Sequence, residues 1–391
     1  MGQSGLRATR WFAPSHVTAG FIAVLVGYTS SAAIVFQAAH AANATPNQIA
    51  SWLCALGIGM GATCIGLSLY YRSPVLTAWS TPGAALLATS LSGVSMSEAT
   101  GVFIFSSSLL LIVGISGWFD RLMKYIPKAL ASAMLAGVLL RFGIGVFAEL
   151  ANSVATVGTM LLAYLLAKRW LPRYAVPLTL LAGILTATGA GHMHWGEASL
   201  QFAHLEFVHP SFSFSTLIGV GIPLFLVTMA SQNLPGVAVL RANGYDLPVS
   251  PIIGWTGLTG LVLAPFGGFS FNLAAITAAI CMSPDADPDP RRRYLASVWA
   301  GLFYLALGLL GATVVSVFAV FPQSLIIAIA GIALLGVIGN SLADSLIHTD
   351  GREAALLTFL VTASGFSLFG IGSAFWGLVV GLTAHLLLKQ K

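Results

Sequence analysis

The sequence has very little charge. Only 7% of its 391 residues are Asp, Glu, Lys or Arg, whereas a water-soluble domain carries about 25%. With 57% hydrophobic residues, the chain cannot cover a water-facing surface of its own size, so a lipid bilayer must be its solvent. The 17 Lys and Arg residues are spread too thinly to form a basic patch. These properties exclude a cytosolic enzyme, a nucleic-acid-binding protein and a disordered chain.

Motifs for metals, redox chemistry and nucleotides are also missing. The three cysteines, Cys54, Cys64 and Cys281, lie inside apolar runs without CxxC spacing, which is typical of small buried hydrophobes. The His192-Met193-His194 spacing is weak evidence for a metal. No P-loop is present, so ATP does not drive this protein directly. We therefore expect no metal and no cofactor.

Long apolar runs fill most of the chain, and each is punctuated by turn residues or charges. A spanning helix needs about 20 apolar residues, and on this basis the sequence predicts an all-α integral membrane protein with fourteen transmembrane segments. Their ranges are 17–40, 49–71, 74–91, 97–116, 127–148, 153–169, 174–190, 213–238, 249–266, 267–283, 293–319, 322–343, 353–369 and 372–388.

The basic residues test this count independently. If the N-terminus is cytoplasmic and the chain crosses fourteen times, no outer loop carries a basic residue, and Arg141 alone lies deep within a span. Cytoplasmic loops of membrane proteins collect Lys and Arg, so the pattern predicts that both termini are cytoplasmic. The residues on the inner side are Arg7, Arg10, Arg72, Arg121, Lys124, Lys128, Lys168, Arg169, Arg173, Arg241, Arg291, Arg292, Arg293, Arg352, Lys389 and Lys391.

The two halves of the chain repeat a pattern at an offset of seven spans. The Ile126-Pro127-Lys128-Ala129-Leu130 segment opens span 5, and the similar Phe321-Pro322-Gln323-Ser324-Leu325 segment opens span 12. Seven is an odd number, so the two halves would have opposite orientations in the membrane. The sequence thus predicts a 7+7 inverted repeat, an architecture that secondary transporters use.

Spans 3 and 10 are expected to be broken, each into a short extended strand and a half-helix. In span 3, Ser80 or Thr81 can cap a helix in which Pro82 takes the first position. In span 10, Gly267–Phe271 precede Asn272 as the expected cap. Both half-helices would then begin at mid-membrane and run in opposite directions. Two helix N-termini pointing at one location predict an anion site. Two kinks filled by protein contacts are the alternative.

Polar residues of other spans are expected to complete this site. Span 8 carries the run Ser231-Gln232-Asn233, and its repeat partner, span 1, carries Tyr28-Thr29-Ser30-Ser31. A run of three polar side chains cannot all face one neighbouring helix, which favours cavity lining over helix–helix contacts. Trp79, Phe269 and Phe271 lie beside the expected caps, where they would either sandwich a flat ring or serve as ordinary packing.

Arg141 is the one basic residue deep inside a span, so we expect it to face protein or water. Glu149, two helical turns away, or Glu98 at the outer start of span 4 could form an ion pair with it. We favour this structural ion pair. The alternative is a role of Arg141, Glu98 or Glu149 in gating or proton transfer.

Several segments of the chain resemble the BenE family. They are Gly20–Tyr28, Leu76–Leu86, Pro223–Asn233, Ala274–Cys281 and Val361–Gly365, and the resemblance covers essentially the whole chain. It implies a benzoate/proton symporter of the bacterial inner membrane, related to the uracil-permease and sulfate-permease superfamily. It also implies a core domain of residues 17–116 and 213–319 that moves against a gate domain of residues 118–190 and 322–388.

One departure from the nucleobase branch of that superfamily is informative. Those permeases carry carboxylates at what look like the positions of Ser231 and Phe271, and neither acid is present here. We therefore expect import of benzoate or a similar small aromatic carboxylate together with protons, and no enzymatic activity. Another small anion or a nucleobase is the alternative in transport, and an intramembrane enzyme is the alternative from another class. A homodimer that forms through the gate domain is a further possibility. The expected substrate-binding residues are Tyr28, Ser31, Trp79, Ser80, Thr81, Gly83, Ser231, Gln232, Asn233, Phe269, Phe271 and Asn272.

Overall fold

The computed structural model describes residues 13–119, 121, 127–193, 195, 199–347, 349 and 351–388. Helix forms within each of the fourteen predicted ranges. Within the described residues, seven helices are long and apolar enough to cross a membrane, or eight if one bent pair counts as a single span. The predictions for Arg7, Arg10, Lys124, His194, Lys389 and Lys391 lie outside the described part of the chain.

The helices of the first half begin with α1 (Pro14–Ala41) and α2 (Pro46–Tyr71). A short strand, β1 (Thr77–Trp79), then leads into α3 (Thr81–Ser90), which is followed by α4 (Met96–Ser116). After the next connection come α6 (Lys128–Asn152), α7 (Val154–Trp170), the short η1 (Pro172–Tyr174) and α8 (Ala175–Gly189). The range predicted as span 3 thus contains a three-residue strand followed by a ten-residue helix.

The second half opens with one long helical run, residues 214–242. It comprises α9 (Phe214–Thr216), η3 (Leu217–Gly221), α10 (Ile222–Thr228), η4 (Met229–Asn233) and α11 (Leu234–Ala242), of which η3 and η4 are π-helical. Next come α12 (Val249–Leu263), η5 (Ala264–Phe266), β2 (Phe271–Leu273) and α13 (Ile276–Met282). The chain continues through η6 (Pro290–Arg292), α14 (Tyr294–Leu309), α15 (Gly311–Val320), α16 (Gln323–Leu346), α17 (Arg352–Ser364) and α18 (Ser373–Leu388).

Two predicted spans differ in detail from the structure. The range 293–319 is not one straight helix, because α14 and α15 meet at an angle of 66°. The range 353–369 is helical only to Ser364, where Gly365 adopts a left-handed conformation and ends α17. A small antiparallel hairpin, β3 (Ser367–Leu368) with β4 (Ile371–Gly372), then leads into α18.

Helix packing separates two groups of elements that are interleaved in the sequence. In one group, α2 lies against α14, α4 lies against α12, and α1 lies against both α3 and α14. Gly57 and Gly308 allow the first contact, since a Cβ atom on Gly57 would lie 2.5 Å from the Gly308 Cα. In the other group, α6 packs against α16 and α17, while α7 packs against α8. The groups meet mainly where α1 contacts α8 and α16, and where α3 and η4 contact α6.

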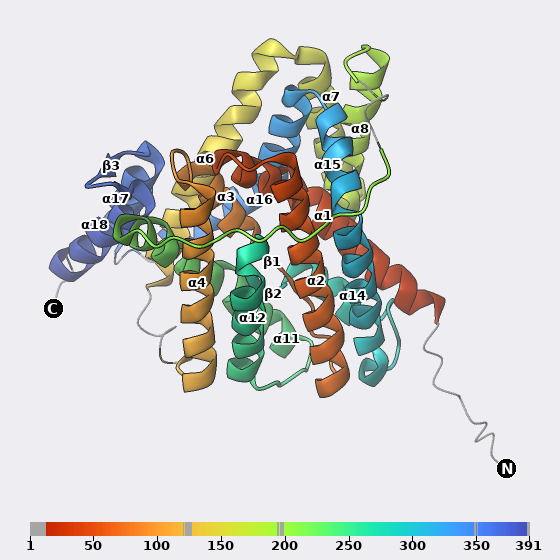
Figure 1. The fold of residues 1–391 in the computed structure, drawn as a ribbon, viewed down its shortest axis with the longest axis horizontal. Coiled ribbons are helices and arrows are strands. Elements are labelled where there is room, and N and C mark those ends of the chain that lie inside the picture. Colours follow the sequence, from red (N-terminus) through yellow and green to blue (C-terminus); the bar gives the residue numbers. More distant parts are fainter. Residues whose placement is uncertain are drawn as a thin grey trace.

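Two short strands lie at the middle of the first group (Figure 1). β1 and β2 pair antiparallel, with Ala78 opposite Asn272 and Trp79 opposite Phe271. The pair contacts α2, α12 and η4. Because the partners are almost 200 residues apart in sequence, this ladder joins the two halves of the chain at the place where each has a broken span.

An extended segment, residues 199–213, crosses the ends of several helices of the first group (Figure 1). Its backbone accepts a hydrogen bond from Thr313 N–H at Gln201 and donates others from Ala203 to the Leu309 carbonyl, from Val208 to Pro265 and from Ser211 to Ser97. Ser51 Oγ of α2 accepts from the Glu206 N–H at 2.9 Å. We call this segment the strap. All of these partners belong to the group that contains α2, α4, α12, α14 and α15.

Candidate functional site

The start of α3 is fully formed by its own residues. Ser80 caps the helix, with its hydroxyl oxygen accepting the Gly83 N–H at 3.0 Å, and Pro82 occupies the first turn. Pro82 has no N–H, and that of Gly83 is already bonded, so within this turn the Thr81 N–H is the donor left for a ligand. The predicted cap is confirmed, but the α3 terminus offers fewer donors than the sequence indicated.

The start of α13 is built differently, and the prediction that Asn272 caps it is wrong. Asn272 lies within β2, and α13 begins only at Ile276, after Ala275, which makes no side-chain cap. The helix has seven residues. The β1–α3 segment therefore has a capped helix terminus, whereas the β2–α13 segment has a strand that carries a polar side chain.

The Asn272 side chain is buried and its amide is unpaired. The residue is 0% exposed, and within the described part of the chain neither Oδ1 nor Nδ2 has a hydrogen-bond partner. Directly opposite residues of a ladder share one face, so Asn272 shares a face with Ala78. The other face packs on α2, where Thr77 Oγ1 lies 2.6 Å from Thr63 Oγ1. A buried amide without partners costs free energy, and a ligand with polar groups would remove this cost.

A second unpaired polar atom comes from α1. The Tyr28 ring lies against the Trp79 ring, with centroids 5.0 Å apart, and the buried Tyr28 hydroxyl has no partner among the residues described. Trp79 is fixed from the same helix, because its indole N–H donates to Ser31 Oγ at 2.7 Å. Ser31 thus positions Trp79, while Tyr28 presents a free hydroxyl and an aromatic ring beside β1.

The polar run of span 8 lies in the π-helical turn η4, a helix irregularity that is frequent at functional sites. Its three side chains have different tasks. Ser231 Oγ donates to the Val227 carbonyl, and Asn233 Oδ1 accepts the Leu273 N–H at 3.0 Å. Asn233 therefore holds β2 in place. The partly buried Gln232 makes no side-chain hydrogen bond in the described structure, so its amide remains available to a ligand.

The two phenylalanines of span 10 lie in the hydrophobic core. Phe269 contacts Trp52 and Phe103, at ring-centroid distances of 6.0 and 6.1 Å. The Phe271 ring fills the space beside Gly59 of α2. Both are 0% exposed. These contacts correspond to the ordinary-packing alternative that the sequence left open.

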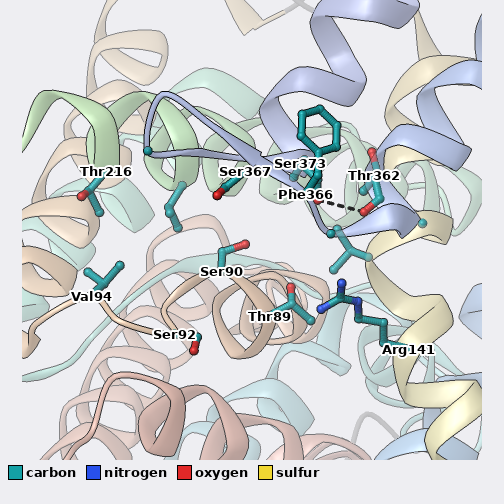
Figure 2. A pocket seen from close by; sticks show the side chains of 17 residues that line it. Thr89, Ser90, Ser92, Val94, Arg141, Thr216, Thr362, Phe366, Ser367 and Ser373 are labelled. Carbon is teal, nitrogen blue, oxygen red and sulfur yellow. Dashed lines mark hydrogen bonds between the residues drawn. The ribbon is translucent and has the colours of Figure 1, made fainter.

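The expected ion pair of Arg141 is not formed. Glu98 instead completes the capping box of α4 with Ser95, and Glu149 Oε2 accepts from Asn152 Nδ2. Arg141 makes one long hydrogen bond, 3.5 Å, from Nη2 to the Ser364 carbonyl. Its side chain lines a cavity of about 370 Å³ among α3, α6, η3 and the β3–β4 hairpin (Figure 2).

One buried ionisable pair was not anticipated from the sequence. His16 Nε2 of α1 lies 2.7 Å from Asp287 Oδ2, in the loop between α13 and η6. Burial by itself would raise the pKa of Asp287, but the Asp289 N–H, His16 and Arg292 together hold it below its ordinary value. The run Asp285-Ala286-Asp287 was the available signal, yet nothing local links it to a histidine 271 positions earlier. Within the described residues, no group of His, Cys, Asp and Glu is arranged to hold a metal ion.

Comparisons with known proteins agree with a transporter fold. The inner membrane protein YdcO of Escherichia coli is 51% identical over 376 residues, which cover 96% of each chain. A benzoate membrane transport protein of Acinetobacter baylyi is 39% identical over 378 residues, again covering 96% of each. The transmembrane domain of the cyanobacterial bicarbonate transporter BicA matches with a TM-score of 0.58 at 14% identity, over 95% of this chain and 97% of that one.

A further structural match is SLC26A9, with a TM-score of 0.58 at 14% identity, over 94% of this chain and 65% of that one. At this identity the structural matches establish the fold alone. The family model described as benzoate membrane transport protein (BenE) matches residues 10–387. With nearly the whole chain matched by the family model and by two relatives, this protein is a membrane transporter that belongs to the BenE family.

Proposed function

We propose that this protein is a proton-coupled secondary transporter that imports benzoate or a similar small aromatic carboxylate across the bacterial inner membrane. Membership of the benzoate transport family supports the substrate class. The observation that carries the proposal is the pair of buried, unpartnered polar groups beside the β1–β2 ladder, the Asn272 amide and the Tyr28 hydroxyl. Each could hydrogen-bond a carboxylate, and the Tyr28 ring packs against the Trp79 ring of β1.

The charge of the site favours an anion. The sequences of α1, β1, α3, η4, β2 and α13 contain no Asp or Glu. A benzoate anion there meets no negative side chain from these elements, and it gains from the positive end of α3. Two like charges 4 Å apart at an effective dielectric of 20 repel by about 4 kcal/mol. The absence of Asp and Glu from these elements therefore contributes to anion binding alongside the hydrogen-bond donors.

The proposed topology has fourteen crossings in a 7+7 inverted repeat, with both termini in the cytoplasm. Antiparallel pairing of β1 with β2 supports it, since equivalent strands of two inverted halves run in opposite directions. A contact between two of the basic loops also supports it. Arg173 of η1 lies 3.5 Å from Asp285, so the connection between α7 and α8 and the connection between α13 and α14 share one face of the molecule.

The proposed mechanism is elevator-like alternating access. Residues 17–116 and 213–319 would form the moving core, and residues 118–190 and 322–388 the gate. The two packing groups of helices support this division, and their limited contacts through α1, α3 and η4 are the surfaces that would slide. Glu98 and Glu149 remain the residues proposed to handle protons. We also propose a homodimer through the gate, which the mass of the purified protein in detergent would measure.

Uptake into liposomes tests the function. Purified protein is reconstituted, an inward proton gradient is imposed, and labelled benzoate is counted against empty liposomes. We expect accumulation that disappears when a protonophore collapses the gradient. If the protonophore does not change benzoate uptake, proton coupling is rejected but the substrate assignment stands. Absence of benzoate uptake, with uptake of another solute by the same liposomes, would reject the substrate.

A nucleobase is the second candidate, and one observation favours it. The Asn272 and Gln232 amides each offer one acceptor and one donor group, which suits the edge of a neutral base better than a carboxylate that only accepts. Competition separates the two. An excess of uracil should leave benzoate uptake unchanged if the site is built for an anion, and should suppress it if the site is built for a base.

A further inference from the structure

Arg141 is a cation without an ionic partner in a polar cavity. The structure gives it no ion pair with any described residue, and its long contact with the Ser364 carbonyl leaves most of its five N–H donors free. A charged side chain at this depth of a membrane helix normally faces protein or a water-filled cavity. Here it faces a cavity of about 370 Å³, which lies within the size range of small-molecule sites.

The lining of this cavity suits an anion. Hydroxyl side chains surround the guanidinium, and none of the residues that line the cavity is Asp or Glu. Figure 2 shows Arg141 pointing from α6 toward Thr89 at the end of α3, with Ser90, Ser367 and Ser373 around the same space. A planar guanidinium binds a carboxylate through two parallel hydrogen bonds, so a monocarboxylate matches both the charge and the geometry.

The guanidinium is held in place by close backbone packing. A Cβ atom on Gly365 would lie 1.5 Å from Arg141 Nη2, so only glycine leaves room for the side chain at that point. Gly365 also adopts φ +65°, a conformation that glycine tolerates. The end of α17 therefore closely approaches the guanidinium group.

The cavity lies apart from the proposed site beside the β1–β2 ladder, because its lining includes neither Asn272 nor Tyr28. We call that proposed site the β1–β2 site. Thr89 and Ser90 belong to the last turn of α3, whereas Thr81 at its first turn adjoins β1. Thr89 follows Thr81 by eight positions, which corresponds to about 12 Å along the helix. In the proposed topology α3 runs outward, so the cavity opens toward the outer side.

We propose that Arg141 and the surrounding hydroxyl groups form an outer binding subsite for a small monocarboxylate, which captures the substrate before it reaches the β1–β2 site. This inference rests on the proposed function for the direction of transport, but binding at the subsite can be measured without it. The subsite raises the capture of external substrate, whereas the β1–β2 site governs the translocation step.

Cysteine labelling tests binding directly. The native cysteines Cys54, Cys64 and Cys281 are buried, so Thr89→Cys introduces one accessible thiol facing Arg141. Benzoate should slow its reaction with a hydrophilic maleimide about fivefold or more, and benzamide, the uncharged isostere, should not. The protection should vanish in the Thr89→Cys/Arg141→Gln double variant. Equal protection by benzamide, no protection by benzoate, or protection that survives Arg141→Gln would each overturn the subsite.

Uptake kinetics give the second readout. Arg141→Gln should raise the KM for external benzoate about 10- to 100-fold, the value of hydrogen bonds to a charged group, while the maximal rate changes less than about twofold. Arg141→Lys should recover part of the loss. Lys168→Gln, which removes a positive charge at the far end of α7, is the matched control and should leave KM unchanged. A fall in maximal rate with unchanged KM would contradict capture.

The two proposals fail in different ways. Benzoate protection of Thr89→Cys in a protein that imports no benzoate would reject the proposed function and keep the subsite. Normal benzoate uptake with an unchanged KM in Arg141→Gln would reject the subsite and keep the proposed function.

Discussion

The segments β1–α3 and β2–α13 have the same order of strand and helix but are built differently. The first ends in a helix start that its own residues complete, with Ser80 as cap and Pro82 in the first turn. The second has no cap, a helix of seven residues, and Asn272 buried without partners in its strand. The start of α3 is thus capped by its own residues, whereas β2 leaves a buried side-chain amide without a partner among the described residues.

The turns that precede the two strands are expected to differ most in how strongly a substitution lowers protein stability. The helical segments before them end in left-handed residues, Arg72 with φ 48° and Gly267 with φ 95°. Arg72 is exposed, whereas a Cβ atom on Gly267 would lie 1.8 Å from the Trp52 ring. Gly267→Ala should therefore destabilise the protein by about 3 kcal/mol or more, because it combines backbone strain with overpacking.

Arg72→Ala is the matched variant for this turn, and it should cost about 1 kcal/mol or less because its side chain is exposed. Thermal unfolding in detergent, followed by tryptophan fluorescence, measures both. Equal melting temperatures for the two variants would show that the second turn is not tightly packed on Trp52.

A charge at the unpaired position should abolish anion binding. Asn272→Asp keeps the shape of the side chain and adds a carboxylate. If benzoate lies within about 4 Å, repulsion of about 4 kcal/mol should reduce its affinity roughly a thousandfold near pH 7. Asn272→Ala, which removes the amide without adding charge, should lose far less. Equilibrium binding by calorimetry compares the two, and retention of parental affinity by Asn272→Asp would place the substrate carboxylate elsewhere.

The loops that follow α3 and α13 also differ in their ionisable groups. The loop after α3 leads to the Ser95–Glu98 capping box, while the loop after α13 carries Asp287 paired with His16. Asp287→Asn should destabilise the protein by about 1–3 kcal/mol at neutral pH, because a buried partner loses a charged hydrogen bond. The lowered pKa of Asp287 means that its contribution is complete above its ordinary value of 3.8 and is lost as pH falls through the folded value.

The stability difference between Asp287→Asn and the parent protein should accordingly shrink below about pH 4. Melting temperatures measured in a series of buffers from acidic to neutral pH check this trend. A difference that stays constant down to the lowest pH at which the parent folds would exclude the carboxylate as the source of the stabilisation.

Substitutions at Ser80 and Asn272 should affect stability with opposite signs. Ser80→Ala removes the cap of α3 and should cost about 1 kcal/mol. Asn272→Leu removes a buried amide without partners, so stability should stay the same or rise, while benzoate affinity falls. Chemical unfolding and ligand binding on the same preparations separate the two effects. A loss of stability in Asn272→Leu would mean that the amide has a partner in the folded protein.

The smallest effect is expected at Ser231. Its hydroxyl already donates to the Val227 carbonyl, so Ser231→Ala should change benzoate affinity less than about threefold and stability by about 1 kcal/mol or less. Gln232→Ala, which removes the free amide of the same turn, is the comparison and should weaken binding more. The reverse order in a binding titration would reassign the roles of these two neighbours.

Sequence reasoning predicted the helical ranges well, because long apolar runs and the charges between them are local signals. It placed Ser80 correctly as a cap for the same reason. Asn272 was misread because capping rules consider only neighbouring residues, whereas pairing with Ala78 draws Asn272 into a strand. The burial of Phe271 likewise depends on Gly59, a distant residue of α2.

The two ionisable sites show the same limit. Arg141 and Glu149 share a helix face, but eight residues separate them by about 12 Å along the axis, and Glu149 pairs with Asn152 instead. His16 and Asp287 meet only because α1 packs against α13 in the folded chain. Helical spacing therefore wrongly suggested a contact between Arg141 and Glu149. The contact between His16 and Asp287 cannot be predicted from spacing, because it depends on the packing of distant elements.

The strap formed by residues 199–213 has a mechanical consequence. Its hydrogen bonds to Ser51, Ser97, Pro265, Leu309 and Thr313 fix the relative heights of four helical segments and of η5. Shear between these segments would strain or break the bonds to the strap, so the strap restricts relative movement within the group of helices that contains α2, α4, α12, α14 and α15. We expect any large displacement to be a single translation of the whole unit rather than a sequence of independent helix movements.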